Sequence, residues 1–395
     1  MKKWVVLAAG IVLQLVLGGV YAWSEFTPSL VEEYGFTDGQ SAMVFGLTIA
    51  VFTLSMVVAG RQLARFGPRL MGSIGAILFG AGYLVASQSG GNFYGVLLGI
   101  GVLTGAGIGA GYVCPLTVGM KWFPNNKGLV TGVAVGGFGG GAIVLTNLAR
   151  YLLQTLNWDV FEVFRLVGFS FGGVALLGAL LLSEPTGEET TEGTEAEAGQ
   201  SIRTHLLSGT FLLLTFGIFA GTFAGLLTIG NLKRIITGSG LSGEVATWAI
   251  SIFAVGNAAG RVVWGQAHDR LGSRKTVLLS LLVLAISLVP LLFNLPAPVA
   301  LGTVLLIGAG FGACFVVYAS SMVEHFGSHL FPRLYPICFL GYGLAGITGP
   351  PVAGWLKTAT GSFVPGIGIG VGLVLLALAM LGTRLAGASP ASIAE

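Results

Sequence analysis

Long apolar stretches, each about the length of a membrane-crossing helix, follow one another along the whole chain. Of the 395 residues, 54% are apolar and only 9% are charged, whereas a soluble domain carries about 25% charged residues. The chain therefore has too few charged side chains to cover the surface of a soluble folded domain, and we expect it to lie in a lipid bilayer. Because about 20 apolar residues span a bilayer, twelve crossings would use about 240 residues and leave room only for short loops.

Charge clusters, Pro and Gly pairs and polar tetrapeptides divide these stretches into predicted helices. Their ranges are 4–30, 41–63, 70–88, 93–119, 127–154, 162–183, 206–232, 244–267, 274–294, 299–322, 334–356 and 363–385. One Glu-rich stretch without aromatic residues, 185–204, is typical of a disordered linker. We predict an all-α polytopic membrane protein with twelve transmembrane helices, in two pseudo-symmetric six-helix bundles at 1–184 and 205–395.

The basic residues predict the orientation of these helices. Most of the 19 Lys and Arg residues fall in the loops that share a side with the N-terminus. Since cytoplasmic loops of membrane proteins are enriched in Lys and Arg, we expect both termini to be cytoplasmic and the protein to lie in the inner (plasma) membrane.

An internal repeat supports the two-bundle design. The segments Gly60–Arg69 and Gly265–Arg274 lie 205 residues apart and share Gly at the first and eighth places and Arg at the sixth and tenth. Each segment follows the second predicted helix of its bundle, so the two bundles are expected to share one plan.

The repeated segment resembles the signature loop of the major facilitator superfamily, Gly-x-x-x-Asp-Arg-x-Gly-x-Arg-Lys. The second copy matches in full, whereas Ala64 replaces the usual Asp in the first copy. In that family the loop forms a latch in which a carboxylate, tied to neighbouring guanidinium groups, favours one conformation. The resemblance implies a conformational latch made by Gly265, Asp269, Arg270, Gly272, Arg274, Arg65 and Arg69.

Further segments resemble one branch of this superfamily, the oxalate/formate antiporter and monocarboxylate transporter group. They are Gly18–Ser24, Lys121–Gly128 and the glycine-rich start of the fifth helix. The resemblance, most of all to a bacterial monocarboxylate or lactate transporter, implies a secondary transporter in which two six-helix halves alternate access to a central site.

Arg261 is the residue most expected to bind a substrate. A guanidinium within a membrane helix costs about 2.5–3.5 kcal/mol, so it persists where a partner or a function compensates. Its planar fork matches a carboxylate in geometry and charge, and Asn257 lies one helical turn earlier on the same face. The resemblance agrees, since this group binds its anion through an Arg in helix 8. Animal-type monocarboxylate transporters carry Asp where this chain has Asn257.

A second informative position is Tyr342, where the oxalate exchangers have Lys in our alignment. With Tyr there, the membrane core holds one fixed positive charge, which suits a monoanion better than a dianion because a second carboxylate would be desolvated without a partner. This favours lactate-like or pyruvate-like substrates over oxalate. The other candidate binding residues are tyrosines within apolar segments: Tyr112, Tyr21, Tyr318 and Tyr335.

The sequence also bears on coupling and on the excluded classes of function. No Asp or Glu falls near the middle of a predicted helix, so we expect substrate and Arg261 to share the coupling to a proton.

No ATP-binding loop, no cofactor motif and no enzyme-like set of catalytic residues is present, and His325 and His329 alone do not make a metal site. A net charge of +3 does not favour nucleic acid. The expected partners are therefore a small monocarboxylate, a proton and lipid, with no obligatory protein partner. The alternatives are an organic anion exchanger of the oxalate/formate type and a non-transporting membrane sensor.

Overall fold

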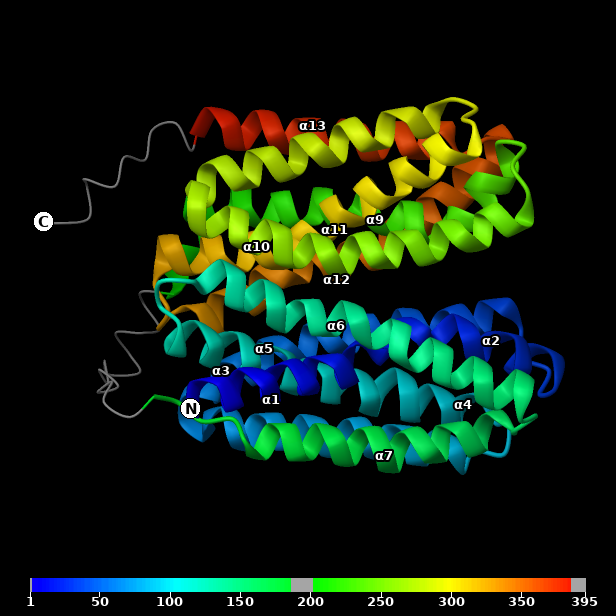
Figure 1. Cartoon of the computed structure of the whole chain (residues 1–395), viewed down its shortest axis with the longest axis horizontal. Helices are drawn as coiled ribbons and strands as arrows, with labels where there is room; N and C mark the ends of the chain where they lie inside the picture. The colour runs from blue at the N-terminus through cyan, green and yellow to red at the C-terminus, as the bar shows by residue number, and fades with distance from the viewer. Residues whose placement is uncertain (1, 186–201, 385–395) are drawn as a thin grey trace, which may run out of the picture. The chain divides into compact units, whose positions relative to one another are not determined.

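The computed structural model describes residues 2–185 and 202–384, and within these ranges the chain forms helices joined by short loops (Figure 1). The chain divides into two compact units, Met1–Glu188 and Glu189–Glu395, called unit 1 and unit 2 below. Most of the predicted linker lies outside the described residues, so its disorder stays a prediction.

Unit 1 consists of ten consecutive helical elements of the described chain. They are α1 (Lys2–Leu17), η1 (Gly18–Ala22), α2 (Trp23–Glu32), α3 (Asp38–Ser87), α4 (Phe93–Val96), η2 (Leu97–Thr104), α5 (Gly105–Trp122), α6 (Lys127–Arg150), η3 (Tyr151–Thr155) and α7 (Val160–Leu180).

Unit 2 repeats this plan with fewer short helical elements among those labelled. Its labelled elements are α9 (Gly209–Gly238), α10 (Gly243–Leu288), η4 (Val289–Leu292), α11 (Ala297–Phe326), α12 (Phe331–Thr360) and α13 (Val364–Arg384).

Small polar residues begin several of these helices. The Thr37 hydroxyl accepts a hydrogen bond from the Gln40 backbone N–H (3.1 Å), and the Gln40 side chain accepts one from the Thr37 N–H (2.9 Å). Ser208 and Ser242 accept similar bonds at the starts of α9 and α10. These side chains satisfy N–H groups that the first turn of a helix leaves without partners, so the helix starts are set locally.

Single glycines break the two longest helices. Gly67 in α3 has φ 74° and ψ 164°, and Gly272 in α10 has φ 76° and ψ 170°. This left-handed φ is readily adopted only by glycine. Both glycines occupy the eighth place of the repeated segment, so the repeat encodes a helix break as well as charges.

Ten apolar helical spans of the described chain are long enough to cross a membrane. The two that contain the breaks are 45 and 50 residues long, about twice the length of one crossing. Counted as two helices each, they bring the total to twelve crossings and confirm the predicted fold class. Each observed break is shorter than the gap between the predicted helices, because helix continues on both sides of a single glycine.

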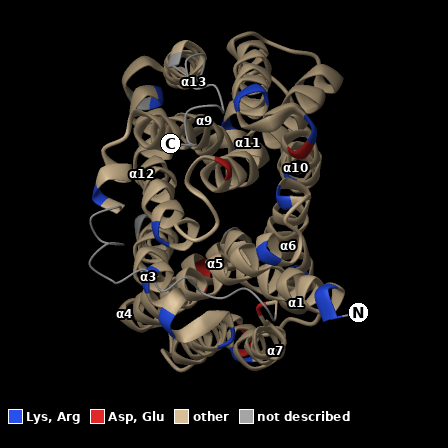
Figure 2. Ribbon diagram, turned by 90° about the vertical axis from the view of Figure 1, so that its left-hand side faces the viewer, with Lys and Arg blue, Asp and Glu red and all other residues tan. Residues whose placement is uncertain are grey.

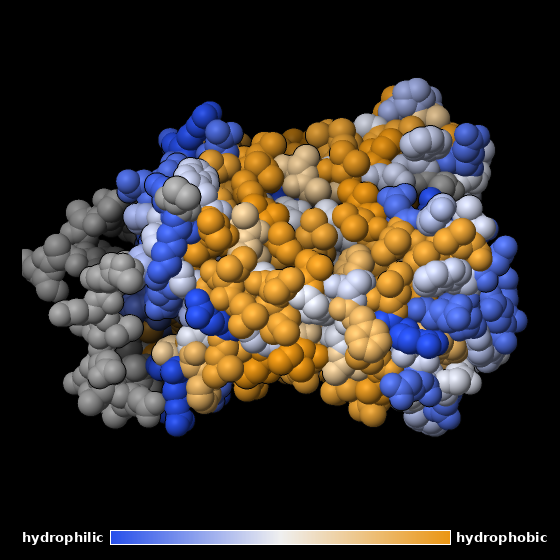
Figure 3. Space-filling model, turned by 60° about the horizontal axis from the view of Figure 1, so that its bottom comes forward, coloured by the Kyte–Doolittle hydropathy of each residue, from blue (hydrophilic) through white to orange (hydrophobic). Residues whose placement is uncertain are grey.

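The surface is consistent with a bilayer environment. Figure 3 shows a broad apolar surface between two hydrophilic ends on the face turned to the viewer. On the helix ends that face the viewer in Figure 2, Lys and Arg are more frequent than Asp and Glu. Contact with water would make an apolar band of this kind unfavourable, whereas contact with lipid does not, so the band favours a membrane environment.

Candidate functional site

Arg261 lies in the part of α10 before its break and is completely buried, with 0% of its surface exposed. Its Nε donates a hydrogen bond to Asn257 Oδ1 (3.1 Å). Its Cζ lies 4.4 Å from the centre of the Phe315 ring, a favourable position for a cation over an aromatic face. Both of these contacts come from neutral groups, and together they orient the guanidinium.

Glycines explain how α10 and α11 come close enough for these contacts. Gly256 and Gly260 of α10 face the α11 backbone, and a Cβ added at Gly260 would lie 2.6 Å from the Cα of Ala309. Gly308 and Gly312 of α11 face the α10 backbone in return. Pairs of small residues four apart let two membrane helices approach closely. Phe315 follows Gly312 by one turn and thereby meets Arg261.

An aromatic wall continues from Phe315 onto α12. Its ring meets Tyr342 edge-on at 5.2 Å between ring centres and Phe339 at 6.0 Å. The Tyr335 hydroxyl donates a hydrogen bond to the Phe315 carbonyl oxygen (3.2 Å). Arg261, Tyr335 and Tyr342 therefore all contact Phe315, and Asn257 is hydrogen-bonded to Arg261.

Tyr318, also on α11, packs against a different helix. A Cβ added at Gly217 of α9 would lie 2.5 Å from the Tyr318 hydroxyl oxygen. Within the described chain this buried hydroxyl has no hydrogen-bond partner. The structure therefore places Tyr318 on the α9 side of α11.

Tyr112 and Tyr21 lie in unit 1, in an aromatic cluster of their own. The Tyr112 ring centre lies 5.3 Å from Phe52 and 5.2 Å from Phe138, and Tyr21 lies 5.7 Å from Phe138. The buried Gln14 side chain donates a hydrogen bond to the Tyr112 carbonyl oxygen (3.0 Å). Tyr112 is itself 1% exposed, and each of these contacts joins residues of unit 1.

The two clusters occupy equivalent places in the repeat. The offset of 205 residues takes Phe52 to Asn257 and Met56 to Arg261. In unit 1, a Cβ added at Gly109 of α5 would lie 2.5 Å from the Phe52 oxygen, and Gly312 of α11 faces Asn257 in the same way. Unit 1 thus carries the buried, apolar Met56 where unit 2 carries a cation.

The structure adds aromatic residues that were not among the predicted site residues. Phe339 lies between Tyr335 and Tyr342 on α12, and Phe138 lies between Tyr21 and Tyr112 in space. Phe339 lies four residues after Tyr335 and three before Tyr342, a spacing that puts all three on one helix face. The sequence could therefore have indicated Phe339 as a site residue. No comparable signal in the sequence links Phe138 to α5.

The predicted latch residues lie around the two helix breaks. Asp269, Arg270, Arg274, Arg65 and Arg69 are all exposed. Their pairing in a latch stays a prediction.

A polar cluster that the sequence did not indicate lies beside the break in α10. Glu324 Oε2 on α11 accepts a hydrogen bond from the Ser273 N–H (3.1 Å) and lies 3.5 Å from His268 Nε2. The Ser273 hydroxyl donates to the Ser321 hydroxyl (2.7 Å). Glu324 therefore caps the helix that restarts after Gly272.

Comparison with known proteins shows similarity over almost the whole chain. A family model described as Major Facilitator Superfamily matches residues 7–242 and 232–393. The chain is 28% identical to the uncharacterized MFS-type transporter YhjX of Escherichia coli, over 87% of this chain and 86% of the relative. It is 23% identical to the oxalate:formate antiporter of Oxalobacter formigenes (91% and 86% covered) and 26% identical to human monocarboxylate transporter 11 (91% and 78% covered).

Solved structures share the fold. The transporter FucP in its outward conformation matches with a TM-score of 0.73 at 15% identity, over 95% of this chain and 98% of that one. The proton:xylose symporter XylE matches with a TM-score of 0.72 at 16% identity, over 97% and 96%. At such low identity the likeness concerns the fold alone.

Proposed function

The chain belongs to the major facilitator superfamily, whose members are membrane transporters and not enzymes, and we propose that it carries small monocarboxylates such as lactate or pyruvate together with a proton. The proposed cycle is alternating access, in which the substrate site opens to one side of the membrane at a time.

The observation that carries this proposal is the buried, oriented guanidinium of Arg261. Asn257 holds its Nε and the Phe315 ring supports one face. A fork held in this way meets a planar carboxylate with two parallel hydrogen bonds and loses little side-chain entropy on binding. The neighbouring phenylalanines and tyrosines supply apolar and hydroxyl surface suited to the short carbon chain of a lactate-like acid.

The charge of the site supports a monoanion. Tyr342, the residue aligned with the Lys of oxalate exchangers, lies on the aromatic wall beside Phe315. One fixed positive charge balances one carboxylate, whereas a dianion would bring a second, desolvated carboxylate without a matching cation.

Proton coupling follows from the cost of moving a buried charge. A cation in the membrane core resists any rearrangement that desolvates it further, and a bound carboxylate neutralises it. Net uptake of an anion alone would build up a membrane potential, so a proton that accompanies the substrate makes the cycle electroneutral. Transport should therefore respond to a pH gradient.

The test is uptake of radiolabelled L-lactate into proteoliposomes with an inward proton gradient. We expect Arg261→Gln to lower uptake by about a hundredfold or more, because the substrate carboxylate loses a buried charged partner. Arg261→Lys keeps the charge but not the fork, and we expect an intermediate loss. Arg234→Gln, at an exposed Arg of unit 2, is the matched control and should transport normally.

Two results would overturn parts of this proposal. Normal uptake by folded Arg261→Gln protein would show that Arg261 is not the anchor. Uptake by the wild type that ignores the imposed pH gradient would exclude proton symport.

The second candidate is an organic anion exchanger, which the similarity to an oxalate:formate antiporter favours. Vesicles preloaded with formate would then take up labelled oxalate without any pH gradient, and empty vesicles would not. The monocarboxylate proposal expects little oxalate uptake in either case.

A further inference from the structure

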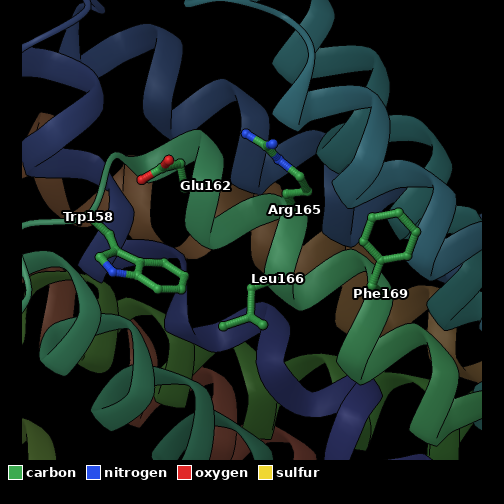
Figure 4. A pocket seen from close by; sticks show the side chains of 5 residues that line it. All are labelled: Trp158, Glu162, Arg165, Leu166 and Phe169. Carbon is green, nitrogen blue, oxygen red and sulfur yellow. The ribbon is translucent and has the colours of Figure 1, made fainter.

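The lateral surface of unit 1 carries an open depression at the start of α7. It has a volume of about 520 Å³ and is lined by Trp158, Glu162, Arg165, Leu166 and Phe169 (Figure 4). None of these residues takes part in the proposed transport site.

The lining residues share one outward face of α7. Glu162, Arg165, Leu166 and Phe169 are spaced three and four residues apart, which aligns them along the helix, while α7 packs against α3 and α1. Phe169 is 68% exposed. One turn further along, a Cβ added at Gly173 would meet nothing within 4 Å, so the face below Phe169 stays open.

The position of these residues along α7 matches the layers of a phospholipid monolayer. The span Val160–Leu180 has 21 residues and is about 31 Å long at 1.5 Å per residue, close to the thickness of the hydrocarbon core. The first turn, with Glu162, therefore lies at headgroup level. Arg165 begins about 4.5 Å deeper and Phe169 about 6 Å deeper again. Helical side chains lean towards the N-terminus, so the Arg165 guanidinium reaches back to the headgroups.

Glu162 and Arg165, the two charged residues of this depression, do not form an ion pair with each other in the described part of the chain. Among the described residues no ion pair joins Arg165 to a carboxylate, whereas the nearby Arg150 pairs with Glu25 at 2.6 Å. Glu162 Oε2 accepts a hydrogen bond from the Asp159 N–H (3.3 Å), which holds its carboxylate at the helix start. Figure 4 shows Glu162 and Arg165 on the same side of α7, with Phe169 further along the helix.

We propose that this depression binds a phospholipid whose headgroup ends in a primary ammonium group, in the leaflet opposite the N-terminus of unit 1. The Arg165 guanidinium binds the phosphate diester. The Glu162 carboxylate, one turn further out, binds the ammonium group beyond the phosphate. Trp158 lies at the interface, where indole rings are favoured, and Leu166, Phe169 and the open face at Gly173 receive an acyl chain.

Native mass spectrometry of the full-length protein, titrated with defined lipids, tests the assignment. The probes are phosphatidylethanolamine, phosphatidylcholine, whose quaternary nitrogen has no N–H donor, and inorganic phosphate as a competitor. We expect the wild type to bind phosphatidylethanolamine about tenfold more tightly than phosphatidylcholine, the size of one charge-assisted hydrogen bond. Inorganic phosphate should not displace the lipid, because it brings no acyl chain.

Three variants separate the roles of the two charges. Arg165→Gln should lose the tightest lipid-binding step for both phospholipids. Glu162→Gln keeps an acceptor for the Asp159 N–H and should bind both phospholipids with similar affinity. Arg234→Gln removes an exposed Arg elsewhere and should bind as the wild type does.

The proposal is overturned if the wild type binds the two phospholipids equally, or if Arg165→Gln retains the preference. Displacement by inorganic phosphate would instead identify a site for free phosphate. Lactate uptake is not the readout, so this test stands apart from that of the proposed function.

Discussion

The hydrogen bond between Asn257 and Arg261 orients the buried guanidinium. Asn257 Oδ1 is a neutral acceptor 3.1 Å from Arg261 Nε. A neutral acceptor orients the guanidinium without cancelling its charge, which is what the proposed binding of a carboxylate requires. The identity of residue 257 as an amide is therefore part of the site's chemistry.

We predict that Asn257→Asp weakens lactate transport. The new carboxylate would form an ion pair with Arg261 and compete with the substrate, at a cost of about tenfold in apparent affinity. Concentration-dependent uptake into proteoliposomes measures this, with Asn257→Ser as the uncharged control that should lose less. Equal losses in the two variants would mean that the charge at position 257 has no effect.

A second residue-scale prediction concerns Tyr34, in the loop between α2 and α3 of unit 1. Its hydroxyl donates a hydrogen bond to Asp159, and this bond raises the pKa of Tyr34 to about 12. A raised pKa means that the bond contributes stability fully below the ordinary value of 10 and loses it as the pH rises through 12.

Ultraviolet titration of tyrosinate checks this prediction. The difference between the wild type and Tyr34→Phe should show one tyrosine that ionises near pH 12. If the tyrosine lost in Tyr34→Phe ionises near the ordinary value of 10 instead, the Tyr34–Asp159 bond does not form.

At the scale of the elements, the breaks at Gly67 and Gly272 shape α3 and α10. Each break lets one long helix turn into two membrane crossings without a loop, and the Glu324 carboxylate caps the restarted helix in α10. Each break therefore depends on a backbone conformation that is unfavourable for residues other than glycine.

We predict that Gly272→Ala lowers the free energy of unfolding by about 1–3 kcal/mol, because φ 76° with ψ 170° is a backbone conformation that is essentially restricted to glycine. Gly302→Ala is the matched control in the same unit, because Gly302 is helical and a Cβ there would meet nothing within 4 Å. That variant should keep or slightly raise the thermal unfolding midpoint in detergent. An unchanged midpoint for Gly272→Ala would show that position 272 tolerates a side chain.

At the scale of the whole molecule, the two units share one packing plan and differ in charge. Small residues bring α5 close to α3 in unit 1 and α11 close to α10 in unit 2. The same offset of 205 residues relates the two breaks and relates Met56 to Arg261. The two units thus share a packing plan, but unit 2 carries a buried cation at Arg261 where unit 1 carries Met56, beside its own aromatic cluster around Tyr112.

Some features of this protein follow from the sequence alone because they are local. Apolar length and low charge determine a membrane protein with twelve crossings, and the two glycine-containing segments determine the repeat and the family resemblance. Arg261 stands out because a cation within an apolar helix is costly wherever the helix packs.

The surroundings of Arg261 were decided only by tertiary structure. Hydrophobic periodicity is weak in helices that are apolar on every side, so it does not tell which face of α11 meets α10. The backbone contacts at Gly256, Gly260, Gly308 and Gly312 fix that rotation. They bring Phe315 to the Arg261 side, where its ring also meets Tyr342 of α12, whereas Tyr318, three residues after Phe315, packs against α9.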